Sequence, residues 1–319
     1  MDIAPPPTAA ATATATATLM EQILYEVKRV VVGQDRFLER VMVAMLAQGH
    51  LLVEGVPGLA KTLTVKTLAG TVRGTFKRIQ FTPDLVPADL VGTRMYHQRT
   101  GEFATTLGPV FTHLLLADEI NRASPKTQSA LLEAMEEKQV TVEGETRALP
   151  HPFFVIATQN PHDQLGTFAL PESQLDRFLM RISIGYPDRA AERHLLAGGD
   201  RRDMVEGMLP LLSPGELESL QQQVLAVHAA EPLLDYVQDL IAATRSGRWF
   251  LQGLSPRAGI ALIRAAKAQA LIAGRDYVAP DDVQAVLPQT IAHRLVPVGD
   301  AGRGAAEQVV AMVEAVPLK

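Results

Sequence analysis

Residues 55–62 constrain this chain more than any other segment, because they have the pattern of a phosphate-binding loop. They follow the apolar run 51–53 and lead into a helical pattern that begins near Leu63. A strand, a glycine-containing loop and a helix start place backbone N–H groups and a helix N-terminus around an anion. In that arrangement Lys61 reaches the β- and γ-phosphates, and the Thr62 hydroxyl coordinates Mg²⁺. The predicted nucleotide-binding residues are Gly55, Val56, Pro57, Gly58, Leu59, Ala60, Lys61 and Thr62.

Ala60 departs from the usual loop pattern, which has a second glycine at this position. Alanine has the smallest side chain after glycine and tolerates helical dihedral angles, so it fits if the backbone is already entering the helix. Taken alone, the segment also fits a glycine–proline turn before an amphipathic helix with an exposed lysine.

Composition limits the classes of protein to consider. The chain has 319 residues, of which 47% are hydrophobic and 20% charged, so we expect a globular core. A net charge of −5 and 5% aromatic residues give no overall basic surface or stacking platform, so we expect no nucleic-acid partner. The chain has no cysteine, which fits a reducing compartment, and we expect a cytoplasmic protein. No stretch is long and apolar enough to span a bilayer, so we expect no membrane insertion.

The chain is predicted to have three parts. Residues 1–18, with three prolines and alternating alanine and threonine, should form a tail without fixed structure. Over residues 19–187 apolar runs alternate with helical patterns, which predicts a mainly parallel sheet. Residues 188–319 have only helical patterns and should form a small bundle. The predicted strands lie at 51–53, around Ile79, and at 114–116, 153–156 and 182–184, and the predicted hairpins at 95–105 and 140–149.

Two carboxylates follow the apolar run 114–116 directly. Asp118 and Glu119 would lie at the carboxyl edge of the sheet, where ligands bind in open α/β folds. Asp118 would hold Mg²⁺ beside Thr62, often through water, and Glu119 would orient or deprotonate the attacking water. The alternative is a helix N-cap with an acidic first turn. Asn160 ends the next predicted strand. Two interpretations of Asn160 remain: a contact with the γ-phosphate, or an ordinary turn residue before proline.

Six segments in order resemble the MoxR family of AAA+ ATPases, and the resemblance covers about residues 20 to 297. It implies an α/β phosphate-loop core with a parallel sheet and hairpin insertions, followed by a small all-α lid domain. Ala60 is an expected variant of the loop in this family. The segments that carry the resemblance are 31–34, 55–62, 116–122, 157–161, 175–178 and 253–258.

The resemblance also implies roles for single residues. Asn160 matches the sensor-1 position, Arg177 the arginine finger that reaches a neighbouring subunit's nucleotide, and Arg257 the sensor-2 arginine of the lid. A permanently charged, planar guanidinium suits the charge that spreads over a phosphoryl group during transfer. Near the adenine we expect Val32, Gly33 and Gln34.

Alternatives remain for the three arginines. Arg177 also fits a salt bridge to Glu172 or Glu192, and Arg257 fits a solvated surface arginine. As a cation in a first helical turn, Arg257 opposes the macrodipole by about 0.3–1 kcal/mol, which a bound phosphate would offset. Two interpretations of Arg122 also remain: a residue at a subunit interface, or an ordinary surface arginine at the start of a helix.

The resemblance implies ATP hydrolysis with Mg²⁺ at the subunit interfaces of a homo-oligomeric ring, which we expect to be a hexamer. The ring would remodel or mature a partner protein, including insertion of a metal cofactor, commonly with a von Willebrand factor A-domain partner. The residues do not identify the client. Two rivals are a nucleic-acid motor, with Arg94, His97 and Arg99 as the only candidate contacts, and a non-catalytic ATP-dependent scaffold.

Overall fold

The structure is a computed structural model, and it describes residues 9–55, 61–97, 102–160, 166–198, 204–205, 207–299 and 304–318. The chain divides into two compact units. The α/β unit comprises Val27–Leu38 and Gln48–Glu218, and the helical unit comprises Met1–Glu26, Glu39–Ala47 and Ser219–Lys319. Three helices cross this division, namely α1 (Ala9–Val30), α2 (Asp35–Leu46) and α9 (Pro214–Ala226).

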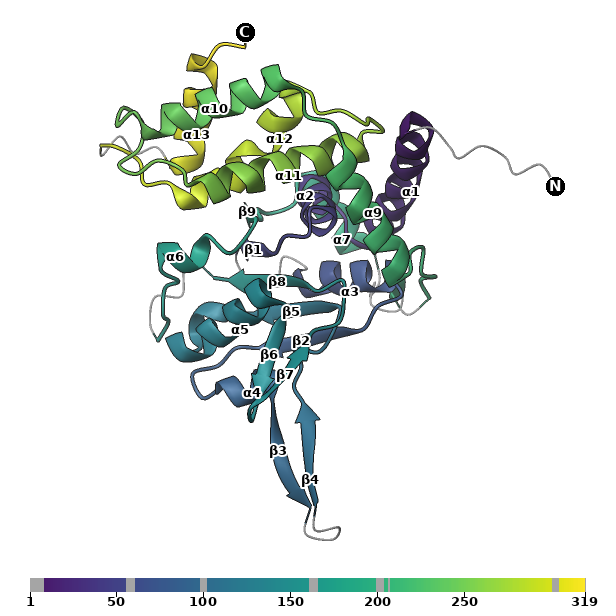
Figure 1. Ribbon diagram of the computed structural model, residues 1–319. Helices are drawn as coiled ribbons and strands as arrows, with labels where there is room; N and C mark the ends of the chain where they lie inside the picture. Colours follow the sequence, from purple (N-terminus) through teal and green to yellow (C-terminus); the bar gives the residue numbers. More distant parts are fainter. Residues whose placement is uncertain are drawn as a thin grey trace, which may run out of the picture. The chain divides into compact units, whose positions relative to one another are not determined.

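A five-stranded parallel sheet forms the centre of the α/β unit, in the strand order β2-β5-β8-β1-β9 (Figure 1). Each of the five predicted apolar runs overlaps one of these strands, and the parallel-sheet prediction is confirmed. Strand β8 lies between β1, which leads to the phosphate loop, and β5, which carries the acidic pair. The strands are β1 (Leu51–Glu54), β2 (Phe76–Gln80), β5 (Leu114–Asp118), β8 (Phe154–Gln159) and β9 (Met180–Ser183).

Helices and two hairpins complete the α/β unit. Apolar residues of β5 and β8, such as Leu115 and Val155, form a core with Leu131 and Leu132 of α5. The two predicted hairpins are present, and β3–β4 extends away from the sheet (Figure 1). The hairpin strands are β3 (Gly92–His97), β4 (Glu102–Leu107), β6 (Gln139–Val142) and β7 (Glu145–Ala148). The helices are α3 (Lys61–Thr71), α4 (Pro87–Val91), η1 (Ile120–Arg122), α5 (Pro125–Glu137), α6 (Glu172–Leu175) and α7 (Arg189–Ala197).

His50 is a buried histidine directly before β1. Its Nδ1 accepts a hydrogen bond from the Val155 backbone N–H at 3.1 Å, so Nε2 carries the proton and donates to the Met135 carbonyl at 3.2 Å. Burial is the main cause that lowers the pKa of His50 to about 4. The neutral ring therefore joins β8 to α5 inside the core.

We expect the α/β unit to lose stability in mild acid because of His50. The unfolded chain takes up a proton near pH 6.5 but the folded chain only near pH 4, so the contribution is complete above pH 6.5 and is lost as the pH falls between these values. From this group alone, the free energy of unfolding should be about 2 kcal/mol lower at pH 5 than at pH 7. Urea unfolding at both pH values measures this. His50→Gln should weaken this pH dependence, and His194→Gln, at an exposed position on α7, is the control that should leave it unchanged. An equal loss of stability between pH 7 and pH 5 in all three proteins would contradict the assignment.

The helical unit is built around the pair α11 (Pro256–Ile272) and α12 (Pro280–Ile291). Leu262 of α11 and Val283, Val286 and Leu287 of α12 are buried. The Ser255 hydroxyl accepts a hydrogen bond from the Ala258 N–H and caps the start of α11. The other elements are α10 (Glu231–Arg245), η2 (Ala292–Arg294) and α13 (Ala305–Ala315).

For residues 9–18 the structure corrects the prediction of a tail without fixed structure, because α1 begins at Ala9. Residues 1–8 lie outside the described part of the chain. Ala13 and Thr16 are buried, and they continue the spacing of Met20 and Ile23 along one face of the helix. The Thr16 hydroxyl also donates to the Gln223 side chain at 2.9 Å. Alternating alanine and threonine suggested low complexity, but alanine is the strongest helix former and threonine fits where its hydroxyl has a partner.

The division into compact units also differs from the predicted boundary near residue 188. The units separate between Glu218 and Ser219, inside α9, and parts of α1 and α2 belong with the helical unit. The end of the strand pattern marks where the sheet ends, but α7 and the first turn of α9 still belong to the α/β unit. Within the part of the chain that the structure describes, no helix has the length and apolar character that a membrane crossing requires.

Candidate nucleotide-binding site

The phosphate-loop segment begins at Gly55, directly after β1, and residues 56–60 lie outside the described part of the structure. The roles of Val56, Pro57, Gly58, Leu59 and Ala60 therefore stay predictions. The first two residues of α3 are Lys61 and Thr62. The Lys61 ammonium donates a hydrogen bond to the Gly55 carbonyl at 2.6 Å, so the Lys61 side chain reaches back to the carboxyl end of β1.

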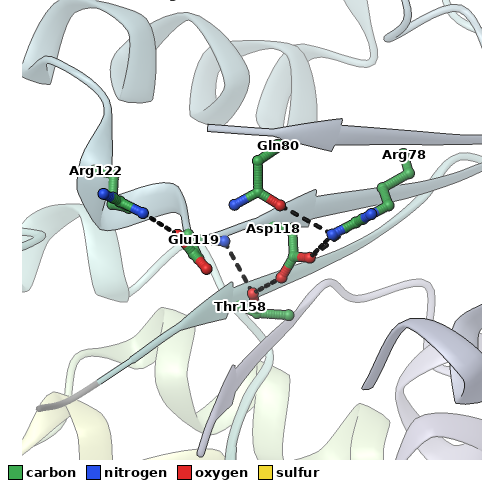
Figure 2. A network of polar contacts seen from close by, with 6 residues as sticks. All are labelled: Arg78, Gln80, Asp118, Glu119, Arg122 and Thr158. Carbon is green, nitrogen blue, oxygen red and sulfur yellow. Dashed lines mark hydrogen bonds and ion pairs between the residues drawn. The ribbon is translucent and has the colours of Figure 1, made fainter. Parts of the chain in front are cut away.

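The acidic pair lies at the carboxyl end of β5, beside the end of β8 (Figure 2). The buried Thr158 hydroxyl of β8 donates to Asp118 Oδ1 at 2.5 Å and accepts from the Glu119 backbone N–H at 2.9 Å. One hydroxyl thus positions both carboxylate-bearing residues. Thr158 was not predicted as a site residue, although it directly precedes Gln159 and Asn160 in the segment 157–161.

Arg78 of β2 is the second partner of Asp118. Its Nε and Nη2 donate to Asp118 Oδ2 at 3.2 and 2.6 Å, and Nη2 also donates to Gln80 Oε1 at 2.9 Å (Figure 2). Both oxygens of the Asp118 carboxylate therefore have a protein donor. Arg78 was not predicted as a site residue, because nothing in the sequence shows which strand lies beside β5.

Glu119 has a left-handed backbone conformation, with φ of 58° and ψ of 48°. This conformation is uncommon for a residue other than glycine and costs of order 1–3 kcal/mol, so the surrounding contacts must hold it. The strand ends here and η1 begins, which brings Arg122 back beside Glu119. Arg122 Nη1 lies 2.9 Å from Glu119 Oε2 (Figure 2). A role of Arg122 at a subunit interface stays a prediction.

Lys61 lies close enough to the acidic pair to sense its charge. Burial, the largest effect, lowers the pKa of the Lys61 ammonium, and the negative charges of Asp118 and Glu119 act in the opposite direction. Lys61, Arg78 and Arg122 together bring three positive charges to two carboxylates. Such a surplus of cations favours a polyanion such as a triphosphate.

A second polar network joins the other strand ends. The buried carboxylate of Glu54, the last residue of β1, accepts from Arg181 Nε of β9 at 2.7 Å and from Gln159 Nε2 of β8. This contact fixes the point where the phosphate loop leaves β1 relative to the strand that precedes Asn160. None of these three residues was predicted as a site residue, because they become neighbours only through the strand order.

The remaining predicted residues of the α/β unit lie in loops near strand ends. Asn160 directly follows β8, and Arg177 lies between α6 and β9. Over the described residues the Arg177 side chain has no hydrogen bond or ion pair, so the alternative salt bridge to Glu172 or Glu192 is absent.

The segment predicted to face the adenine lies beside the chain that follows β9. Gln34 Nε2 donates to the Gly185 carbonyl at 3.2 Å. Gly33 has a φ of 75°, and a Cβ there would lie 2.6 Å from the Ala191 Cβ, so only glycine fits. Its neighbour Val32 is half-buried, and contacts of the three with adenine stay a prediction.

Arg257 belongs to the helical unit. It is the second residue of α11, after the Ser255 cap, and its side chain is exposed. The predicted role at the nucleotide stays a prediction for this residue.

Comparisons with known proteins agree on the fold and the family. The model of the ATPase family associated with various cellular activities (AAA) matches residues 50–180, and the AAA lid domain model matches residues 242–314. Chaperone MoxR1 of Mycobacterium tuberculosis is 48% identical over 312 residues, which cover 93% of this chain and 81% of that protein. Protein MoxR of Methylorubrum extorquens is 32% identical over 300 residues, covering 85% of each chain.

A solved structure shows the same fold. The crystal structure of a protein described as an ATPase, from Cytophaga hutchinsonii, superposes with a TM-score of 0.87 and 39% sequence identity, covering 97% of both chains. The predicted α/β core with a parallel sheet and an all-α lid domain is thereby confirmed. The chain belongs to the MoxR family of AAA ATPases, and this membership implies that it binds and hydrolyses ATP.

Proposed function

We propose that this chain is a Mg²⁺-dependent ATPase that works as a homo-oligomeric ring, a hexamer, and uses ATP hydrolysis to remodel or mature a partner protein. The observation that carries the proposal is the meeting of Lys61, Asp118 and Glu119 at the carboxyl edge of one parallel sheet. A cation for the phosphates, an acid for the metal and a group that orients the attacking water recur in enzymes that transfer a phosphoryl group to water.

The Thr62 hydroxyl and the Asp118 carboxylate fit Mg²⁺, because hydroxyl and carboxylate oxygens are the ligands it takes in such sites. Both Asp118 oxygens already accept protein hydrogen bonds, so we expect Asp118 to act on the metal through water. When bound, Mg²⁺ would neutralise charge that develops on the phosphate oxygens. Lys61 would hold the β- and γ-phosphates, Glu119 would orient and deprotonate water, and Asn160 would contact the γ-phosphate.

The ring is proposed on the strength of Arg177. The described residues give its guanidinium no partner within the chain, which suits a side chain that serves a neighbouring subunit. An arginine supplied in trans stabilises the charge of the transition state. Arg257, on the lid domain, would contact the phosphates of its own subunit, so that ATP binding and release change the angle between the two domains.

The partner is a protein in this proposal. The relative from M. tuberculosis carries the name chaperone, which supports a role in maturing other proteins. Insertion of a metal cofactor is part of our proposal and rests on the family resemblance alone. We propose a von Willebrand factor A-domain protein as the direct partner and the cytoplasm as the compartment, since the chain has no cysteine. The hairpin β3–β4 exposes Met95, Tyr96 and Phe103 and is our candidate contact.

Phosphate release from ATP tests the enzymatic part. Hydrolysis should require Mg²⁺, stop with a chelator, and be lost in Lys61→Ala. Binding of ATP without turnover would instead support the scaffold. Stimulation by single- or double-stranded DNA with a steep salt dependence would support the nucleic-acid motor.

A further inference from the structure

The proposed chemistry gives Arg78 no role of its own, although its contact with Asp118 is held by several hydrogen bonds. The two residues come from adjacent strands, and Gln80 lies opposite Asp118 in the register of β2 and β5. Gln80 Oε1 accepts from the same guanidinium nitrogen that binds Asp118 Oδ2, so the Arg78 side chain is held from both sides (Figure 2). The Asp118 side chain is only 14% exposed, whereas that of Arg78 is 44% exposed.

This contact occupies the group that a metal would use. Asp118 Oδ2 accepts from Arg78, and Oδ1 accepts from Thr158. Without nucleotide, the Arg78 guanidinium already balances the negative charge of Asp118, and the Lys61 ammonium adds a further positive charge nearby. Both charges weaken the attraction of Asp118 for a divalent cation. Elsewhere in the described residues, no group of three or more acidic or histidine side chains is arranged to hold a metal ion.

A bound triphosphate changes this balance. It adds several negative charges beside Lys61 and brings its own oxygen ligands for the metal. The same site that disfavours a bare dication then favours the complex of metal and nucleotide, because the nucleotide outweighs the charge of Arg78.

We propose that Arg78 is a positioning residue that acts through Asp118: it orients the carboxylate and competes with a bare divalent cation, so that the metal enters together with the nucleotide. The inference rests on the proposed function, in which Asp118 serves the metal. Arg78 and the metal, which Asp118 would hold through water, then both draw on the negative charge of one carboxylate, and each weakens the effect of the other. Coupling of this kind typically changes an affinity about 5- to 150-fold.

Binding of Mn²⁺ to the nucleotide-free full chain tests the proposal, since the electron paramagnetic resonance signal of free Mn²⁺ is lost on binding. Arg78→Gln should bind Mn²⁺ at least about fivefold more tightly than the wild type. Lys77→Gln is the matched control, because it removes one positive charge from the opposite face of the same strand and should stay near the wild-type affinity. Adding Asp118→Asn to Arg78→Gln should abolish the gain, which places it at this carboxylate.

Arg78→Met, which also removes the charge, repeats the measurement if Arg78→Gln does not fold. The proposal would be overturned if the wild type and the folded Arg78 variant bound Mn²⁺ with equal affinity. It would also be overturned if the gain in Mn²⁺ affinity persisted in the double variant with Asp118→Asn. Binding of a fluorescent ATP analogue with Mg²⁺ is measured in the same proteins. If the wild type binds the analogue but the Mn²⁺ affinities do not differ, the inference on Arg78 fails and the ATPase proposal stands. If the wild type does not bind the analogue, the proposed function itself fails.

Discussion

Glu119→Gln is expected to lower ATP turnover about 10²- to 10⁴-fold while ATP still binds. The amide keeps the size of the side chain and its backbone bond to Thr158, but it cannot take a proton from water. Because the nucleotide then stays intact, the variant should also hold the ring in its ATP-bound form. Single-turnover hydrolysis and equilibrium binding of labelled ATP separate the two effects.

The matched control is Glu133→Gln, which neutralises an exposed glutamate on α5. It should hydrolyse ATP at the wild-type rate. Turnover in Glu119→Gln equal to that of this control would show that another group deprotonates the water, and the role given to Glu119 would be withdrawn.

Arg177→Ala is expected to lower hydrolysis about 10³- to 10⁵-fold with little change in ATP binding, because the side chain acts on the neighbouring subunit. Lys61→Ala has the complementary defect, since it loses its own site but keeps a functional Arg177. Mixing the two inactive proteins should therefore restore activity at those interfaces where Lys61 of one subunit meets Arg177 of the next. Phosphate release as a function of the mixing ratio measures this.

Arg193→Ala is the control for removing an exposed arginine from the same unit, and it should keep full activity. No recovery in the mixture, with rings intact by light scattering, would argue that Arg177 acts within its own subunit or not at all.

The strands and hairpins could be predicted from the sequence because their signals are local. The apolar run 114–116 predicts a buried strand, whatever its neighbours in the sheet are. The turn residues at 143 and 144 likewise predict a hairpin from the local sequence alone. The helix α1 is the exception, since its first half depends on partners such as Gln223 that lie about 200 residues further along the chain. Local composition cannot reveal such a partner.

The site could be predicted only in part, for the same reason. Lys61, Asp118 and Glu119 stand in motifs whose chemistry is readable from residue type and spacing. Thr158, Arg78 and Glu54 have no motif, and each acquires its contact from the strand order, which places β8 between β1 and β5 and β2 beside β5. Sequence alone predicts a parallel sheet but not this order, so the residues that position the acids become visible only in the structure.

The central claim, an ATP site shared between subunits, is tested most directly by ATP hydrolysis per subunit as a function of protein concentration, with mass by light scattering on the same samples. Specific activity should rise cooperatively over the concentration range in which rings form, and ATP should shift that range to lower concentration. A monomer that hydrolyses ATP at the same specific rate as the assembled protein would contradict the account.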